Sequence, residues 1–573
     1  MVTIAKNIVD TLEANGVERM YGIAGDSLNG VTDALRSSPI RWVQVRHEEA
    51  AAYAAGAEAA LTGRLAVCAG SAGPGNLHLI NGLYDAQRSR VPVLAIAAHI
   101  PTAEIGTGYF QETHPQEVFR ECSVFAEHVS SVTQMPRMLR VAMQRAIELR
   151  GVSVLVLPGD IALAEAKDDA VTVIHPSDAR IVPSVAKLRR AAELLDAADR
   201  VTILAGAGCA DAHDELVALA ERLGAPVVHA MRGKEYVEWE NPCDVGMTGL
   251  LGFASGYAAI EACDALLMLG TDFPYPDFLP ADKTIIQVDV RGEHLGRRVP
   301  LDLGLVGSVR DTADALLHLV RRKEDRRHLE TARNHYAKTR EKLDDLAGPV
   351  KAGRPQHPQF IARTIDEVAA DDAVFLPDVG SPVMWAARYL KMNGRRRMIG
   401  SFTHGSMANS VSQAIGVQAA NPGRQVITLS GDGGLTMMLG ELLTLVQNKL
   451  PVKIVVFDNS SLNFVELEMK AAGFVNWGTG LSNPDFAEVA RALGLHATTV
   501  RDSDALAPAL QEAFAHDGPA LVNVITERQE MTVPPSVTAA QLKGFSLYAL
   551  RTVISGRGDE ILDLARANLR QVF

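Results

Sequence analysis

Residues 430–462, with the sequence SGDGGLTMMLGELLTLVQNKLPVKIVVFDNSSL, decide the fold. An apolar run, VITLSG (426–431), leads into this stretch, and a second run, VKIVVF (452–457), lies within it. A segment of helix length separates the runs, which predicts a strand, one crossover helix and a second strand parallel to the first. Asp432 follows the first run and Asn459 follows the second. Because open α/β sheets bind ligands at the carboxyl ends of their strands, we expect a ligand site at these two residues.

Short apolar runs rich in β-branched residues recur along the chain, with segments of helical periodicity between them. The runs show no polar alternation, which is typical of parallel strands covered on both faces. Such a pattern predicts an α/β protein with parallel sheets. The predicted strands are 65–70, 91–98, 152–159, 201–208, 225–230, 265–270, 284–290, 426–431, 452–457 and 520–525.

The chain has 573 residues, which is too long for a single hydrophobic core. Its composition changes near 167–184, which is polar and contains proline, and again in the charge-dense stretch 321–359. We interpret the second stretch as a solvated helix with a linker, because acids interleave its bases and disfavour a nucleic-acid site. The predicted domains are 1–180, 181–333 and 334–529, followed by a tail, 530–573.

The overall charge and the cysteines exclude several classes of protein. A net charge of −12 argues against a nucleic-acid partner that needs a large basic face. The five cysteines are an odd number without CxxC pairing, so we expect buried free thiols in a reducing compartment. The N-terminus lacks the apolar core of a signal peptide, and no run reaches the ~18 apolar residues of a membrane span. We therefore expect a cytosolic protein.

The two strand ends in the opening stretch predict a Mg²⁺–diphosphate site. A carboxylate, an amide oxygen and a backbone carbonyl just beyond are the hard oxygen ligands that suit Mg²⁺, which usually also holds phosphate oxygens. Gly433 and Gly434 would let backbone N–H groups approach an anion at the start of the following helix. A Gly-Asp-Gly alone is also an ordinary turn. The combination with Asn459 at this spacing, with a strand before each, is much more specific.

This segment resembles the signature of the thiamine diphosphate (ThDP)-dependent enzymes, in which GDG is followed some two dozen residues later by paired amides. This chain departs from the pattern by carrying Asp458 before Asn459. The resemblance implies three doubly wound parallel-sheet domains and Mg²⁺ held by Asp432, Asn459 and the carbonyl of Ser461. The stretches DVGSP (378–382) and THGSMANS (403–410) resemble further cofactor elements of the family. The implied ThDP contacts are Glu48, Val379, Gly405, Ser406, Met407, Asp432, Gly433, Gly434, Asn459, Ser460, Ser461, Leu462, Asn463, Phe464 and Val465.

ThDP chemistry also needs a carboxyl group for the aminopyrimidine ring of the cofactor. The stretch RHEEAAAYAAGAEAALTGR (46–64) offers Glu48 at the start of an Ala-rich helix whose small residues allow close packing. An isolated Glu there could equally serve the helix dipole. The stretch resembles the family's H-E-x-x-A-A element, which selects Glu48 rather than Glu49. CAGSAGPGNLHLINGLYDA (68–86) resembles the family's cofactor loop and also reads as a tight strand-to-helix turn. The resemblance further implies that Glu48 and Asp432 meet across a subunit interface, in a homo-oligomer that is commonly a tetramer.

The middle block resembles the FAD-binding domain of pyruvate oxidases. Gly206-x-Gly208 after a strand suggests a nucleotide site, although GxG turns are common. Asp289 at a strand end could accept a ribose hydroxyl or cap a helix, and the sequence favours neither. The implied FAD contacts are Gly206, Gly208, Thr248, Gly249, Leu250, Leu251, Gly270, Thr271, Asp272, Phe273, Pro274, Val288 and Asp289.

Two further stretches are implied to surround the substrate. By the same resemblance, Phe110 and Gln111 line the pocket at the reaction centre. Phe464 and Val465, which follow the metal strand, close over the substrate, and Glu468 is a weaker candidate.

The C-terminal stretch KGFSLYALRTVISGRGDEILDLARANLRQVF (543–573) predicts a final amphipathic helix that starts near Asp559. Its apolar stripe with basic flanks could lie in a membrane interface or dock on its own protein. The stripe comprises Leu562, Ala565, Leu569 and Val572, and Arg566 and Arg570 point elsewhere. The segment resembles the lipid-binding C-terminus of bacterial pyruvate:quinone oxidoreductases, including GFSLY and ISGRGDE. We expect it to dock near the active site at rest and to move to phospholipid when substrate binds.

The resemblance spans essentially the whole chain. It implies a peripheral enzyme on the cytoplasmic face of the membrane that oxidatively decarboxylates pyruvate to acetate and CO₂. Electrons would pass through FAD to a membrane quinone, either ubiquinone or menaquinone. The alternatives are an acetohydroxyacid synthase-like carboligase, an oxygen-dependent pyruvate oxidase and a non-catalytic membrane scaffold.

Overall fold

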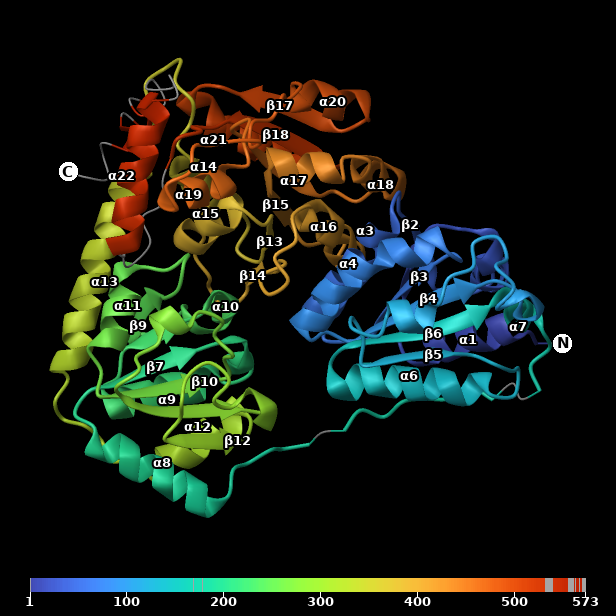
Figure 1. Ribbon diagram of the computed structural model, residues 1–573, viewed down its shortest axis with the longest axis horizontal. Coiled ribbons are helices and arrows are strands. Elements are labelled where there is room, and N and C mark those ends of the chain that lie inside the picture. The colour runs from blue at the N-terminus through green and yellow to red at the C-terminus, as the bar shows by residue number, and fades with distance from the viewer. Residues whose placement is uncertain are drawn as a thin grey trace.

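A computed structural model gives three six-stranded parallel sheets that follow one another along the chain, with helices on both faces of each (Figure 1). The structure describes residues 2–167, 170–177, 179–530, 539–554, 561, 563–565 and 567–568. The predicted α/β fold of three doubly wound domains is confirmed. The described parts of the connection between the first and second domains, residues 170–177 and 179–184, run along the lower side of the view in Figure 1.

The first sheet has the strand order β2-β1-β3-β4-β6-β5. Its strands are β1 (Arg19–Gly22), β2 (Arg41–Gln44), β3 (Ala66–Gly70), β4 (Val93–His99), β5 (Phe125–His128) and β6 (Val152–Pro158). Its helices are α1 (Ile4–Ala14), α2 (Asn29–Leu35), α3 (Glu48–Thr62), α4 (Pro74–Ser89), α5 (Pro115–Val118), α6 (Met135–Leu149) and α7 (Gly159–Leu163).

The second sheet has the order β12-β11-β10-β7-β8-β9. Counted within the domain and read from the β9 edge, this is 3-2-1-4-5-6, the order of doubly wound dinucleotide-binding domains. Its strands are β7 (Val201–Ala205), β8 (Val227–His229), β9 (Asp244–Met247), β10 (Ala265–Leu269), β11 (Thr284–Asp289) and β12 (Leu303–Val306). Its helices are α8 (Val185–Ala197), α9 (His213–Leu223), α10 (Lys234–Val237), α11 (Ala254–Glu261) and α12 (Val309–Leu317).

The third sheet, β14-β13-β15-β16-β18-β17, repeats the order of the first. Its strands are β13 (Val374–Pro377), β14 (Arg397–Met398), β15 (Val426–Gly431), β16 (Lys453–Asp458), β17 (His496–Val500) and β18 (Ala520–Ile525). Helix α13 (Arg327–Leu346), largely exposed, precedes the sheet and confirms the solvated helix predicted there. The remaining helices are α14 (Pro358–Val368), α15 (Ser381–Tyr389), α16 (Asn409–Ala420), α17 (Asp432–Met437), α18 (Glu441–Asn448), α19 (Asn463–Ala471), α20 (Phe486–Ala492), α21 (Ser503–Ala515) and α22 (Ala539–Ile554).

All ten predicted apolar runs are strands, and β15 and β16 are parallel neighbours as expected. The prediction of one crossover helix between them was wrong. The crossover consists of α17 and α18, separated at residues 438–440 around Gly440. The break allows α18 to begin at Glu441, whose side chain is buried against the first domain.

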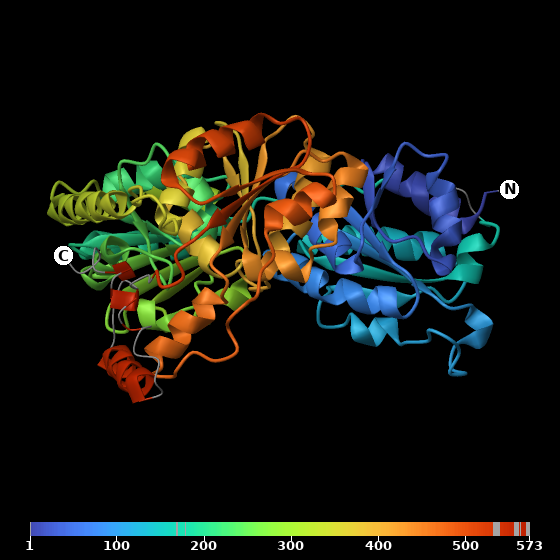
Figure 2. The same ribbon diagram turned by 90° about the horizontal axis from the view of Figure 1, so that it is seen from above.

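The first and third domains share a continuous hydrophobic core. Alanine-rich α3 packs on α4 within its own domain and on α16 of the third domain. A Cβ added to Gly416 would lie 1.9 Å from the carbonyl oxygen of Ala54, so the two helix backbones are nearly in contact. The expectation that the small residues of α3 allow close packing is therefore confirmed. Seen from above, the third domain lies between the other two (Figure 2).

The described part of the C-terminal tail packs on the third domain. Helix α22 lies against α19, where Tyr548 is buried and Arg551 donates to the carbonyl of Gly473 at 2.7 Å. Of the predicted amphipathic stripe, Ala565 is exposed, and its other members lie outside the described residues. Those members are Leu562, Leu569 and Val572, and the predicted helix start Asp559 and the flanking Arg566 and Arg570 also lie outside the described residues.

Two expectations about the chain as a whole can be compared with the structure. The five cysteines (Cys68, Cys122, Cys209, Cys243 and Cys263) are free and buried, as expected. Across the part of the chain that the structure describes, none of the helices combines the length and apolar character needed to span a bilayer.

Replacing Gly416 with alanine should destabilise the protein, although glycine to alanine in a helix normally stabilises by about 1 kcal/mol. The new methyl group meets the backbone carbonyl of Ala54, which cannot move cheaply, so we expect a loss of about 1–3 kcal/mol. Urea unfolding followed by circular dichroism measures the change. Gly423→Ala is the matched control, because a Cβ there meets nothing within 4 Å. Equal stabilities of the two variants would contradict the close helix contact.

Candidate cofactor and metal site

The carboxyl ends of β15 and β16 lie side by side, with Gly431 paired to Phe457 in the register of the two strands. Asp432 begins α17 directly after β15 and is 3% exposed. Asp458 ends β16, and Asn459 follows it into a turn in which Ser460 has a φ of +54°. The structure therefore brings the predicted metal residues together at one edge of the third sheet.

Two carboxylates converge at this edge on a single amide nitrogen. The Nδ2 of Asn483 donates to Asp432 Oδ2 and to Asp458 Oδ1, each at 2.8 Å. The backbone N–H of Ser460 also donates to Asp432 Oδ2, at 2.6 Å. Burial, together with the nearby Asp458 charge, raises the pKa of Asp432 to about 6. The buried Asp432 carboxylate, the Asn459 amide oxygen and the Ser461 carbonyl are hard oxygen donors, so the residues present fit Mg²⁺.

The sequence analysis did not single out Asn483 and regarded Asp458 only as a departure from the family pattern. Asn483 lies in an irregular segment more than twenty residues after the signature, where no local periodicity marks it. Among the described residues, no group of three His, Cys, Asp or Glu side chains is arranged to hold a metal. A site built from one carboxylate, one amide and one carbonyl would not form such a group.

The turn after β16 is held by a buried glutamate that the sequence analysis also missed. Asn459 Oδ1 accepts the N–H of Ser461 at 3.0 Å, and the Ser461 hydroxyl donates to Glu466 at 2.6 Å. Burial alone would raise the pKa of Glu466, but hydrogen bonds from Arg528, Ser461 and Thr479 hold it below its usual value. Glu468, the candidate named from the sequence, is exposed.

The glycines of the signature are packed tightly. A Cβ on Gly434 would lie 1.9 Å from Asp378 Oδ2, and one on Gly433 would lie 3.4 Å from the Met407 methyl group. Asp378 is fully buried in the DVGSP turn, where desolvation raises its pKa to about 7. Its Oδ1 accepts the N–H of Val379 at 3.0 Å. Met407 thus lies beside Gly433, and Val379 follows the aspartate that packs on Gly434. Their contact with the cofactor stays a prediction.

Glu48 is the first residue of α3 and is 5% exposed. Its Oε2 lies 2.9 Å from Nδ1 of His78 on α4. A Cβ on Gly75 would lie 2.9 Å from Glu48 Oε1, so the Gly73-Pro74-Gly75 turn packs directly on this carboxylate. Gly73 caps α4 with a φ of +68°, which confirms the tight-turn interpretation of that stretch.

The THGSM loop of the third domain reaches the first domain within the same chain. Asn81 Nδ2 donates to the Ser406 hydroxyl at 2.9 Å, and His404 Nε2 lies 2.8 Å from Asn81 Oδ1. Gly405 precedes this contact with a φ of +78°. Gly405 and Ser406, which the resemblance implied as ThDP contacts, therefore lie next to α4, the helix that also carries His78.

The predicted substrate residues lie on two separate domains. Phe110 is 77% exposed on the loop before α5, and Gln111 has a φ of +62° with its carbonyl against Gly73. Phe464 and Val465 lie on α19 next to the metal turn, following Leu462 and the buried Asn463. In the single chain the Phe110 side chain faces solvent rather than lining a pocket.

The predicted FAD residues gather at the carboxyl ends of β7, β10 and β11, where the order of the second sheet reverses. The GxG turn, however, does not form an open phosphate cradle. The N–H groups of Gly206 and Gly208 donate to Leu269 and Gly270 carbonyls at 2.9 Å. A Cβ on Gly206 would lie 2.5 Å from Thr271, so these glycines serve the close approach of two loops. The Gly206-x-Gly208 turn is therefore a close-packing turn, and its place in a nucleotide site stays a prediction.

The other predicted FAD residues surround this switch point. Thr248 is buried, and its hydroxyl has no hydrogen-bond partner among the described residues. Asp289 accepts the N–H of Arg291 at 2.9 Å and so stabilises the turn after β11. It is not the cap of the following short helix, Gly292–His294, whose N-cap is Arg291, so the helix-cap interpretation was wrong. The loops after β9 and β10 also present apolar and polar side chains that are partly exposed. The remaining positions are Gly249, Leu250 and Leu251 after β9, Asp272, Phe273 and Pro274 after β10, and the buried Val288 in β11.

Comparison with family models finds matches in all three domains. Residues 2–118 match the thiamine pyrophosphate enzyme N-terminal TPP binding domain, 188–316 the central domain and 378–524 the C-terminal TPP binding domain. These ranges contain Glu48, the switch-point loops and the Asp432–Ser461 signature respectively.

Three curated relatives are similar over most of their lengths. The putative thiamine pyrophosphate-containing protein YdaP of Bacillus subtilis is 36% identical over 100% of this chain and 99% of its own. Pyruvate oxidase of Lactiplantibacillus plantarum is 30% identical over 90% of this chain and 87% of its own. The acetolactate synthase large subunit of Corynebacterium glutamicum is also 30% identical, over 98% and 92%.

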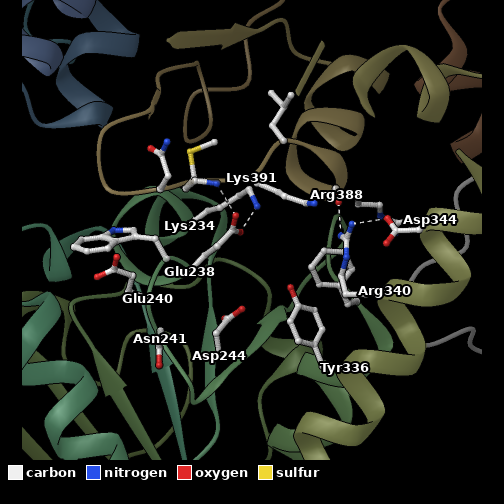
Figure 3. A pocket seen from close by; sticks show the side chains of 15 residues that line it. Lys234, Glu238, Glu240, Asn241, Asp244, Tyr336, Arg340, Asp344, Arg388 and Lys391 are labelled. Atoms are coloured by element: carbon white, nitrogen blue, oxygen red, sulfur yellow. Dashed lines mark hydrogen bonds and ion pairs between the residues drawn. The ribbon is translucent and has the colours of Figure 1, made fainter. Parts of the chain in front are cut away.

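A cavity of about 640 Å³ opens between the second and third domains, and none of the predicted site residues lines it (Figure 3). Its charged groups are mostly paired with each other: Lys234 with Glu238, and Arg340 with Asp344. Asp244 lies at its floor, where burial and then the Glu238 charge raise its pKa to about 8. The Asp244 carboxyl is therefore largely uncharged at neutral pH.

Replacing Asp244 with asparagine should flatten the pH dependence of stability. Between about pH 4 and pH 8 the folded Asp244 holds a proton that the unfolded chain releases, so rising pH favours unfolding. The native protein should lose more thermal stability than Asp244→Asn between about pH 5 and pH 8. Thermal midpoints at several pH values measure this, with the exposed Asp345→Asn as control. Parallel curves for native protein and Asp244→Asn would contradict the assignment.

Proposed function

Because the chain belongs to the thiamine pyrophosphate enzyme family, we propose that it oxidatively decarboxylates pyruvate to acetate and CO₂. In this proposal ThDP and Mg²⁺ lie between the first domain of one subunit and the third domain of another, and FAD lies in the second domain. A membrane quinone receives the electrons. The enzyme works as a homotetramer at the cytoplasmic face of the membrane.

The observation that carries the proposal is the placement of Glu48 and Asp432. Each is buried at the start of a helix, one in each of the two domains that share a core. Asp432, Asn459 and the Ser461 carbonyl would hold Mg²⁺ and through it the diphosphate. Glu48, held by His78, would bind the aminopyrimidine at its other end. When bound, ThDP supplies the electron sink that decarboxylation of a 2-oxo acid requires.

The strand order of the second sheet supports a role for FAD. Loops after β7 and β10 flank the switch point, which is where doubly wound sheets of this order bind dinucleotides. The buried Thr248 hydroxyl offers a hydrogen bond there, and Leu250 and Tyr275, each 40% exposed, offer apolar surface. The similarity to a pyruvate oxidase supports electron transfer as the outcome.

A carboligase is the second candidate, because the similarity to an acetolactate synthase large subunit is equally high. The tail distinguishes the two proposals. Residues 543–573 combine an apolar stripe with basic flanks, which suits contact with phospholipid. The described part of the tail covers α19, the helix that carries Phe464 and Val465.

Anaerobic addition of pyruvate to the holoenzyme should bleach the flavin, and a short-chain quinone should restore its colour. We expect the flavin to bleach because, in this proposal, FAD is the sole acceptor in the protein for the electrons released on decarboxylation. Absorbance near the flavin band and assays for acetate and acetolactate give the readout. A flavin that stays oxidised while acetolactate accumulates would reject the oxidoreductase and establish the carboligase. Peroxide formation in air without quinone reduction would indicate an oxygen-dependent oxidase.

Replacing Asp432 with asparagine should weaken Mg²⁺ binding by about 10- to 100-fold, because the amide lacks the charge that a hard cation prefers. Isothermal titration of Mg²⁺ in the presence of ThDP measures the affinity. Asp517→Asn, at an exposed position in the same domain, is the control. An unchanged affinity in Asp432→Asn would place the cation elsewhere.

A further inference from the structure

Glu441 is a buried carboxylate of the third domain that binds the backbone of the first. It is the first residue of α18 and is 1% exposed. Its Oε1 accepts the N–H groups of His47 at 2.8 Å and Arg46 at 3.1 Å. Its Oε2 accepts the Thr444 hydroxyl at 2.6 Å, which fixes the carboxylate plane.

These two N–H groups lie immediately before Glu48. His47 is the N-cap of α3, so its backbone sets the direction in which the helix and its first side chain leave the turn. Hydrogen bonds to an ionised acceptor are about twice as strong as those between neutral groups. Glu441 therefore holds the residues that orient Glu48 by strong interactions from another domain.

Other residues of α18 bind the segment further back. Arg46 Nη2 donates to Gln447 Oε1 at 2.6 Å, and Asn448 Nδ2 donates to the Gln44 carbonyl at 3.1 Å. Arg41 Nη2 donates to the Asn448 carbonyl at 2.9 Å. Helix α18 thus follows the connection from β2 to α3, and Glu441 holds the end nearest to Glu48.

The same helix pair begins at the predicted metal site. Asp432 opens α17, and Glu441 opens α18 after a break of three residues. The crossover between β15 and β16 therefore presents one carboxylate to the cation edge and another to the N-terminus of α3. This explains why the crossover is broken at Gly440 rather than continuous.

We propose that Glu441 is a positioning residue for Glu48. By binding the Arg46 and His47 backbone, it fixes the start of α3 so that the Glu48 carboxyl meets the cofactor ring in one orientation. This inference rests on the proposed function, in which Glu48 binds the aminopyrimidine. Glu441 itself touches neither cofactor nor substrate in this role.

The first test measures the anchor on the full-length protein without added cofactor. Hydrogen exchange followed by mass spectrometry should show faster exchange in the peptide covering residues 44–52 in Glu441→Ala, and nearly native exchange in Glu441→Gln, whose amide oxygen can still accept. Glu235→Ala is the matched control. Glu235 also joins two domains, because it accepts the N–H of Met398 at 2.8 Å. This contact links the second and third domains and does not involve the segment around Glu48. Equal loss of protection at 44–52 in Glu235→Ala would show a general loosening and overturn the specific anchor.

The second test measures the consequence on the holoenzyme. Deuterium exchange at C2 of bound ThDP, read by NMR after acid quench, reports how well the acid activates the cofactor. We expect Glu441→Ala to slow this exchange by about 10- to 100-fold, because small misplacements of a catalytic group cost this much. Glu441→Gln should recover most of the C2 exchange rate. In Glu441→Ala the affinity for ThDP and Mg²⁺ should change by less than about threefold. Combining Glu441→Ala with Glu48→Gln should slow exchange no further than Glu48→Gln alone.

The outcomes separate the two proposals. A native protein that binds ThDP but does not exchange the C2 proton would overturn the proposed function. Glu441→Ala could lose amide protection at residues 44–52 and still exchange the C2 proton of ThDP at the native rate. That result would overturn the positioning role alone. Equal losses of cofactor affinity and C2 exchange, matched by Glu235→Ala, would show that Glu441 acts only in domain packing.

Discussion

The near contact of α3 with α16 is the constraint on which the rest of the structure depends. Alanines on one helix and Gly416 on the other bring the backbones together and merge the cores of the first and third domains. Because protein interiors are close-packed, such an interface has little freedom to slide. The rigid junction places the turn before Glu48 against α18 and the THGSM loop against α4. Buried charges such as Glu441 are tolerated there because backbone N–H groups satisfy them.

Much of the fold and part of the site follow from the sequence. The uninterrupted apolar runs predicted ten strands because strands buried on both faces need no polar alternation. Short or edge strands such as β2 and β14 escaped prediction, since they carry exposed polar residues and few residues in all. Glu48 and Asp432 were found because each lies in a contiguous motif.

The residues that support the site could not be found in this way. Asn483, Glu466 and Glu441 act through contacts that are distant in sequence or specific to the tertiary packing, and their local sequence resembles that of ordinary helices and loops. The role of the GxG turn of the second domain stayed open for a related reason. A glycine needed for close packing and one needed for a phosphate look identical in sequence, and only the neighbouring loop shows which role applies.

The amide of Asn483, shared by Asp432 and Asp458, bears on the order of events during assembly. Two carboxylates buried at adjacent strand ends would repel each other, and this repulsion would oppose closing the sheet edge. One side-chain NH₂ group offsets part of that cost with material already present in the polypeptide. Small zinc domains, by contrast, remain unfolded until their ion arrives. Here the polypeptide itself supplies a donor shared by both carboxylates, so part of the repulsion at these strand ends is offset by the chain's own amide.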